Sequence, residues 1–138
     1  MQLYFLCTGN SCRSQMAEGL AKALLPPTWR IQSAGVEVHG LNPQAVFAMA
    51  ARGLDISRAQ SKLIDPDYLA TSDVVITLCG DARDRCPALA PGTHALHWPL
   101  PDPAQATGSA AERAVVFATV RDQIEVLIRA TWPQEVQA

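Results

Sequence analysis

The sequence predicts a single α/β domain over residues 1–138, a three-layer sandwich with helices on both faces of a four-stranded parallel sheet. Short strand-like runs alternate with helical stretches along the chain, and two of these runs are continuously apolar. The length of 138 residues fits one domain. We therefore expect right-handed crossovers between parallel strands, with helices packed against the sheet.

Four runs are the candidate strands of this sheet: Leu3–Leu6, Arg30–Ala34, Asp73–Leu78 and Thr93–Trp98. The first and third runs are continuously apolar, which is typical of parallel strands buried on both faces. The first run ends at Cys7 and the third at Cys79. Active sites of open parallel sheets lie at the carboxyl ends of the strands. Both thiols are therefore expected where this fold places its chemistry.

Prolines and capping residues mark the candidate helices. One helix follows Arg13 and stops at Pro26-Pro27. Asn42-Pro43 and Asp65-Pro66 each combine an N-cap with proline at the first helical position. The capping box from Ser109 to Glu112 opens a long amphipathic helix. The residues expected on its inward face are Val116, Val120, Ile124, Leu127 and Ile128.

Composition restricts the class of function. The net charge is −2 and the basic residues are scattered, which argues against nucleic acid or a membrane surface as the main partner. No apolar run approaches the roughly 20 residues of a membrane span, and the N-terminus does not resemble a signal peptide. We expect a cytoplasmic monomer without a cofactor or bound metal. The three histidines show no metal-binding spacing; they are His39, expected in a turn, His97, expected in packing, and His94.

The four cysteines are Cys7, Cys12, Cys79 and Cys86. In a reducing compartment, cysteines are more often catalytic, redox-active or metal-binding than joined in structural disulfides. A zinc site with four thiolate ligands usually shows two C-x2–4-C pairs, whereas this chain has C-x4-C and C-x6-C. Structural zinc is therefore the less favoured alternative.

The stretch CTGNSCR, from Cys7 to Arg13, predicts an oxyanion-binding loop with a nucleophile. Backbone amides of such a loop, together with the N-terminus of the helix that follows, form a nest for a tetrahedral anion. Arg13 adds a forked donor that can hold two oxygens. Gly9 is expected to adopt a positive φ and to permit close approach. The same positive field favours the thiolate form of Cys7. A buried strand-end cysteine beside a surface arginine is the alternative.

The stretch CTGNSCRSQMAEG resembles the phosphate loop of the low-molecular-weight protein tyrosine phosphatase superfamily, and more closely that of its thioredoxin-coupled arsenate reductases. The likeness continues through SAGVEVHGLNPQAV, GLDIS, VVITLCGDARDRCP and HWPLPDPA, and weakens after about Gly108. The resemblance implies that the anion loop comprises Thr8, Gly9, Asn10, Ser11, Cys12, Arg13 and Ser14. It also implies that Asp102 is the proton donor.

The resemblance further implies a three-cysteine relay that reduces arsenate to arsenite. Cys7 attacks arsenic, Cys79 resolves the adduct, and Cys86 forms a final disulfide with Cys79 that thioredoxin reduces. The segment 80–85 is polar and begins with Gly80, so we expect a mobile loop that exposes Cys86. Phosphate and sulfate are expected to act as arsenate mimics. A glutaredoxin or mycothiol system is the alternative electron donor.

Supporting roles follow from the same resemblance. Asn10 is expected to brace the loop, with a turn role as the alternative, and Ser14 to hydrogen-bond Cys7, with helix capping as the alternative. Glu18 and Ser33 correspond to positions that help bind a monovalent cation in some of these reductases. A carboxylate of those members is replaced here by Lys62, whose ammonium is expected to pair with Glu18 in place of potassium or else to be solvated.

Two other functions remain open at this point. A low-molecular-weight phosphatase would use Cys7, Arg13 and Asp102 but would leave the two downstream thiols without a role, and Ala104 stands where phosphatases usually carry an aromatic residue. A non-catalytic sensor of oxyanion or arsenite would leave Arg13 without a purpose. Cys12 is expected to be structural or protective, with a direct part in turnover as the alternative.

Overall fold

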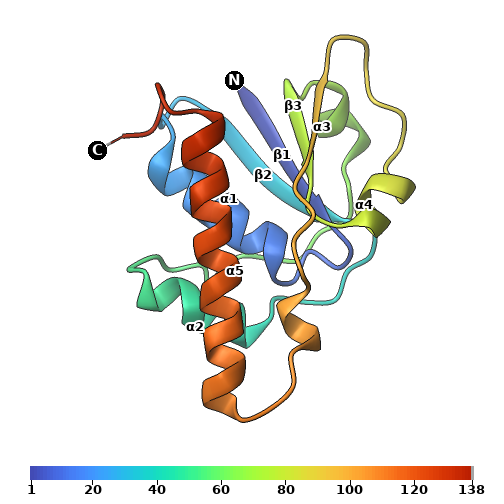
Figure 1. The fold of residues 1–138 in the computed structure, drawn as a ribbon. Helices are drawn as coiled ribbons and strands as arrows, with labels where there is room; N and C mark the ends of the chain where they lie inside the picture. The colour runs from blue at the N-terminus through green and yellow to red at the C-terminus, as the bar shows by residue number, and fades with distance from the viewer. Residues whose placement is uncertain (138) are drawn as a thin grey trace.

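Within the described residues, four parallel strands form the central sheet in the order β2-β1-β3-β4, and Figure 1 shows β1 between β2 and β3. The computed structural model describes residues 1–137. The strands are β1 Gln2–Cys7, β2 Arg30–Gly35, β3 Val74–Thr77 and β4 His94–His97. Each begins and ends within one residue of its predicted bounds, so the predicted parallel sheet is confirmed.

In the part of the chain that the structure describes, five α-helices and one short 3₁₀ helix join and cover the strands. They are α1 Arg13–Leu24, α2 Pro43–Ala51, α3 Pro66–Ala70, α4 Gly80–Arg85, α5 Ala110–Thr131 and the 3₁₀ helix η1 Pro103–Gln105. The predicted caps at Asn42 and Asp65 and the capping box at Ser109 are present. None of the helices within residues 1–137 combines the length and the apolar character that a membrane span requires.

Helices cover both faces of the sheet, because side chains of β1 alternate between the two faces. On one face, Tyr4 packs on Tyr68 of α3 with ring centroids 4.6 Å apart. On the other, Phe5 packs on Trp98 at 5.9 Å, and Trp98 packs on Trp132 at the end of α5. All six residues of β1 are buried, and α1 packs against α5 (Figure 1). The continuous apolar run at the start of the chain thus reflects a central strand covered on both faces.

Two sequence-based expectations about the helices are wrong. Residues 80–85 form helix α4 instead of a mobile loop, because the Cys79 sulfur caps the helix and Ala82 is buried against the sheet. On α5, Val116 is only partly buried, and Phe117 begins the buried stripe that continues through Val120, Ile124 and Ile128. Phe117 lies one position further along the helix, where its larger side chain fills the core.

Candidate active site

The residues after Cys7 form a loop that turns from β1 directly into α1. Cys12 is the N-cap of α1 and makes no side-chain capping bond, which leaves the first amides of the helix available to an anion. The loop surrounds a pocket of about 260 Å³. The pocket is lined by Cys7, Thr8, Gly9, Ser11, Cys12, Arg13, His39, Asp102, Ala104 and Gln105. Asn10 and Ser14 are not among these residues; they are fully buried behind the loop.

The positive backbone angle of the loop belongs to Asn10 and not to Gly9. Asn10 has φ 49°, a conformation that asparagine tolerates better than most residues, and the positive φ predicted for Gly9 is therefore wrong. A Cβ at Gly9 would clash with the ring of His39. Gly9 thus leaves space for a neighbouring side chain, and Asn10 makes the turn.

Asn10 also braces the loop through its side-chain amide, as the sequence predicted. Its Nδ2 donates to Ser14 Oγ at 2.8 Å and to Ser33 Oγ at 2.9 Å. Its Oδ1 accepts from the backbone N–H of Lys62 at 2.9 Å. The amide therefore connects the loop to α1, to β2 and to the segment after α2.

Gln15 is a supporting residue that sequence reasoning missed. Its side chain is buried, and Nε2 donates to the backbone oxygen of Asn10 at 3.2 Å and to Asn10 Oδ1 at 3.1 Å. The same Nε2 donates to Gln60 O at 3.0 Å. The available signal was its position, a polar residue one turn into a helix and directly behind the C-x5-R motif.

Cys7 is nearly inaccessible, with 3% of its surface exposed, and its sulfur lies 2.9 Å from Ser14 Oγ. Because Ser14 Oγ already accepts the Asn10 amide, its own proton is free to point at the sulfur. A hydroxyl donor in this position stabilises a thiolate. Ser14 is the second residue of α1, so the alternative capping role is wrong.

Arg13 connects the loop to the segment that carries Asp102. Its Nη1 donates to Leu100 O at 3.1 Å, and its Nη2 lies 3.9 Å from Asp102 Oδ2. Its Nε is buried and has no hydrogen-bond partner among residues 1–137. An orphaned buried donor at the pocket wall is what a bound oxyanion would satisfy. Asp102 Oδ1 accepts from Ala104 N at 3.0 Å, which holds the carboxylate at the pocket rim.

Cys79 lies at the same sheet edge as Cys7, because β1 and β3 are adjacent and parallel. The backbone N–H of Leu78 donates to Leu6 O at 2.9 Å, so the strands remain paired up to the two thiols. Cys79 Sγ lies 3.3 Å from Thr8 Oγ1, the side chain next to Cys7. The adjacency that the sequence reasoning assumed is therefore confirmed.

Cys86 lies at the opposite end of α4 from Cys79. It is the C-cap of the helix and is half-buried, and burial raises the pKa of its thiol. The two residues are joined by the six residues of α4, so their Cα atoms are roughly 10 Å apart at the rise of an α-helix. A disulfide requires about 4.4–6.8 Å between Cα atoms. Cys86 is thus less exposed than predicted, and α4 must unwind before it can reach Cys79.

Cys12 lies in the wall of the anion pocket, and 4% of its surface is exposed. Burial is the main cause that raises the pKa of its thiol to about 11. Cys12 is therefore a neutral thiol at physiological pH, unsuited to act as a nucleophile there. This agrees with the structural or protective role that the sequence favoured.

The expected ion pair between Lys62 and Glu18 is absent from the described residues, and Lys22 takes that place. Glu18 Oε2 accepts from Lys22 Nζ at 2.6 Å, one helical turn along α1, and Oε1 accepts from Ser33 Oγ at 2.7 Å. Lys62 contributes its backbone N–H to Asn10 and keeps its side chain partly exposed. Residues four positions apart on a helix are neighbours on its surface, so Lys22 is better placed than Lys62 to pair with Glu18.

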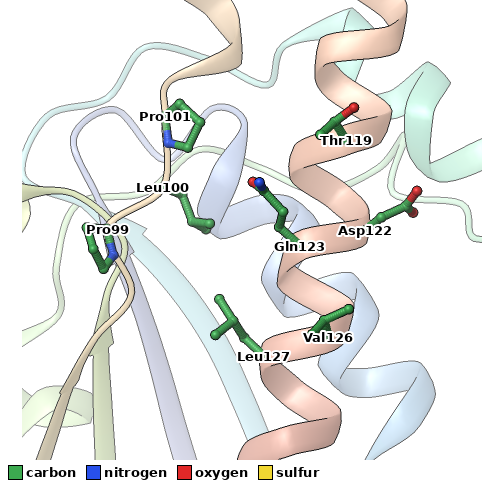
Figure 2. Close-up of a pocket in the computed structure, with 8 residues that line it drawn as sticks. All are labelled: Pro99, Leu100, Pro101, Thr119, Asp122, Gln123, Val126 and Leu127. Atoms are coloured by element: carbon green, nitrogen blue, oxygen red, sulfur yellow. The ribbon is translucent and has the colours of Figure 1, made fainter.

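An apolar cavity lies away from this chemistry. Figure 2 shows a space of about 540 Å³ between the segment 99–101 and α5, with Leu100 and Leu127 pointing into it. Leu100 lines this cavity, and its backbone oxygen accepts from Arg13. The segment 99–101 therefore separates an apolar cavity from the polar anion pocket.

Comparisons with known proteins agree with this geometry. Residues 2–138 match the family described as low molecular weight phosphotyrosine protein phosphatase. An arsenate reductase of Bacillus licheniformis is 57% identical over 122 residues, which are 88% of each chain. A solved structure of an arsenate reductase in the phosphate-binding state is 34% identical with a TM-score of 0.78, covering 97% of this chain and 98% of that chain. A thioredoxin-dependent arsenate reductase of Corynebacterium glutamicum is 30% identical with a TM-score of 0.76, covering 96% of this chain and 60% of that chain. The chain therefore belongs to the low molecular weight phosphotyrosine protein phosphatase family.

Proposed function

We propose that this chain is an arsenate reductase that works by a three-cysteine relay and is regenerated by thioredoxin. The observation that carries the proposal is the position of Cys79, whose sulfur lies 3.3 Å from the side chain next to Cys7 at the carboxyl edge of the sheet. A phosphatase needs no thiol there. The relatives named arsenate reductase support the same activity.

The first step takes place in the anion pocket. The loop amides and Arg13 hold arsenate, and its buried Nε gives one more donor to an arsenate oxygen. The Cys7 thiolate attacks arsenic, and one arsenate oxygen leaves as water after protonation. Asp102, held at the rim 3.9 Å from Arg13, is placed to give that proton. Ala104 keeps the rim small, because arsenate carries no ring to stack on.

The second step transfers two electrons to arsenic. Cys79 attacks the Cys7 sulfur, the bonding pair of the sulfur–arsenic bond passes to arsenic, and arsenite leaves. Cys7 and Cys79 are then joined by a disulfide. Cys86 attacks Cys79 next, which releases Cys7 as a thiolate and leaves a Cys79–Cys86 disulfide. This exchange requires α4 to unwind, because the helix holds its two flanking cysteines too far apart.

Regeneration needs an external dithiol. The thioredoxin dependence named for the Corynebacterium glutamicum relative supports thioredoxin as the donor. The relay requires three cysteines that start as free thiols, which fits a reducing compartment, so we propose a cytoplasmic location. We propose that the monomer is the working unit, since the anion pocket and all three relay thiols belong to one chain.

Disulfide mapping tests this function. Reduced protein is incubated with arsenate, quenched with acid and digested. We expect a Cys79–Cys86 disulfide and one equivalent of arsenite per chain. Cys86→Ser is expected to accumulate Cys7–Cys79 and to lose thioredoxin-linked turnover. Thiols that all stay free after arsenate treatment would contradict the relay. Hydrolysis of an aryl phosphate at a comparable kcat/KM would favour a phosphatase.

A further inference from the structure

Two contacts hold α4 in its helical form, one at each end. At the start of the helix, the backbone N–H of Ala82 donates to Cys79 Sγ at 3.3 Å. At its end, Arg85 Nη1 donates to Glu37 Oε2 at 2.6 Å and to Asp81 Oδ2 at 3.2 Å. Asp81 belongs to α4, whereas Glu37 follows β2. Glu37 therefore connects the last residue before Cys86 to a different part of the domain.

Glu37 is itself held firmly beside the anion loop. Its backbone N–H donates to Thr8 O at 2.8 Å, and its Oε1 lies 2.8 Å from His39 Nε2. The backbone N–H of His39 donates to Gly9 O at 3.0 Å. The hydrogen bond from Arg85 is the main cause that lowers the pKa of Glu37, which is charged at neutral pH. Arg85 is thus tied to a fixed carboxylate whose backbone is paired with the loop that binds the substrate.

We propose that Glu37 is a positioning residue of the relay, which acts through Arg85 to keep α4 helical and Cys86 away from Cys79 until the first disulfide has formed. The role in turnover rests on the proposed function. When Cys79 bonds to Cys7, its sulfur turns away from Ala82 N, so α4 loses its N-terminal contact. The tie to Glu37 then remains as the main side-chain contact at the far end.

The ion pair between Arg85 and Glu37 is weak enough to be broken during each turnover. Arg85 and Glu37 are each 45% exposed, and exposed ion pairs contribute little stability on their own. A helix of six residues does not hold itself in water without such contacts. Together with the burial of Ala82, these two weak contacts keep α4 helical, and the loss of either one makes unwinding easier. The order protects the enzyme, because a premature Cys79–Cys86 disulfide would remove the thiol that resolves the arsenic adduct.

An equilibrium experiment without arsenate tests the tie. In a Cys7→Ser, Cys12→Ser background, only Cys79 and Cys86 can form a disulfide. The protein is equilibrated with mixtures of reduced and oxidised dithiothreitol, in which the two thiols lose two electrons and two protons to the reagent's disulfide. We expect Glu37→Gln to raise the equilibrium constant for disulfide formation about two- to fivefold, the effect of an exposed ion pair. Because this readout needs no substrate, its failure is separate from failure of the proposed reductase activity.

Matched variants make the result specific. Arg85→Gln is expected to give at least the same increase, because it removes the contact to Asp81 as well as the one to Glu37, and adding Glu37→Gln to it is expected to give no further increase. Arg83→Gln removes an exposed arginine of the same helix, whose ion pair within residues 1–137 is with its neighbour Asp84, and is expected to leave the equilibrium unchanged. High salt is expected to raise the constant of the parent and not of Glu37→Gln. The proposal is overturned if Glu37→Gln equals the parent, or if Arg83→Gln shifts the equilibrium as much.

The loss of the Cys79 contact has its own test. In a Cys12→Ser, Cys86→Ser background, oxidised dithiothreitol is used to form Cys7–Cys79, and amide hydrogen exchange of residues 82–86 is compared before and after. We expect faster exchange in the oxidised form. Exchange at an unchanged rate would show that the first disulfide does not loosen α4, and would overturn the proposed order.

Discussion

The loop around Cys7 and the helix between Cys79 and Cys86 are held by opposite kinds of contact. Asn10 is fully buried and joins three other segments through short hydrogen bonds. The ion pairs of α4 involve side chains that are 42–70% exposed. Buried networks fix one geometry, whereas exposed pairs yield easily. One domain thus combines a rigid anion-binding loop with a helix that can unwind. In the proposed mechanism the rigid loop binds arsenate, and the helix unwinds for the disulfide exchange between Cys79 and Cys86.

The largest expected difference between the anion loop and α4 is in the effect of an arginine-to-lysine substitution on kcat/KM. Arg13→Lys keeps the charge but loses the forked donors and the buried Nε that face the pocket. We expect kcat/KM for arsenate to fall by roughly a hundredfold or more, as for loss of a preorganised donor to the transition state. Arg83→Lys on α4 changes an exposed side chain and is expected to stay within about twofold. Steady-state kinetics with thioredoxin in excess measures both. Equal losses at the two positions would remove the distinction between the regions.

Asparagine and aspartate at the two sites offer a comparison of stability. Asn10→Ala leaves the Lys62 N–H, Gln15 and two serine hydroxyls without their partner in a buried place. We expect the free energy of unfolding to drop by about 2–4 kcal/mol. Asp84→Ala on α4 removes an exposed pair and is expected to cost at most about 0.5 kcal/mol. Urea denaturation gives both values, and a cost at Asn10 below that at Asp84 would contradict the rigid-loop interpretation.

Titration of the Cys12 thiol measures how much its burial in the loop affects the stability of the fold. Its pKa is raised to about 11 in the folded protein, mainly by burial, from an ordinary value of 9.0. Because the folded pKa lies above the unfolded one, this contribution to stability is complete below about pH 9 and is lost as the pH rises toward 11. The loss is on the order of 2 kcal/mol.

Urea denaturation of the reduced protein between pH 8 and pH 11, compared with Cys12→Ser, measures this contribution. The buried tyrosines Tyr4 and Tyr68 also have raised pKa values, and they remain in both proteins. The difference between the two curves therefore reports Cys12 alone. If the free energy of unfolding changed with pH in the same way in both proteins, the Cys12 thiol would be accessible to solvent and its pKa would not be raised by burial.

Short-range patterns were sufficient to predict most of the fold and the first half of the site. Caps such as Asn42 and Ser109 act on residues two or three positions away, so the chain itself displays them. The C-x5-R loop is equally local, since Cys7 ends a strand and Arg13 begins a helix. Helix α4 was missed because it is short, begins with Gly80 and is capped by a cysteine, a residue not used as a capping signal.

Contacts between distant segments could not be predicted in the same way. Glu37 and Arg85 meet across 48 positions, and no local pattern indicates their pairing. His39 was assigned to a turn, yet its ring lines the anion pocket because β2 lies beside β1. Glu18 and Lys22 are a different case. Their i, i+4 spacing was visible in the sequence. The prediction nevertheless paired Glu18 with Lys62, because Lys62 replaces a carboxylate that some of these reductases carry.

The smallest expected effect concerns the cation that supports the loop. Glu18 lies beneath the Asn10–Ser33 contact, and both of its oxygens are already occupied, one by Ser33 and one by the Lys22 ammonium. We therefore expect less than about twofold difference in kcat/KM between potassium and sodium salts at equal ionic strength, because neither oxygen of Glu18 is free to bind an added ion. Lys22→Ala frees one oxygen and is expected to make activity depend on potassium, whereas Lys62→Ala is expected to leave the salt response unchanged. Strong potassium activation of the unmodified protein would mean that the Lys22 ammonium does not replace a bound ion. The network behind the loop would then need a potassium ion from the solvent at Glu18. The loop and α4 would both depend on a contact that can be lost to solvent, and they would differ only in how strongly each is held.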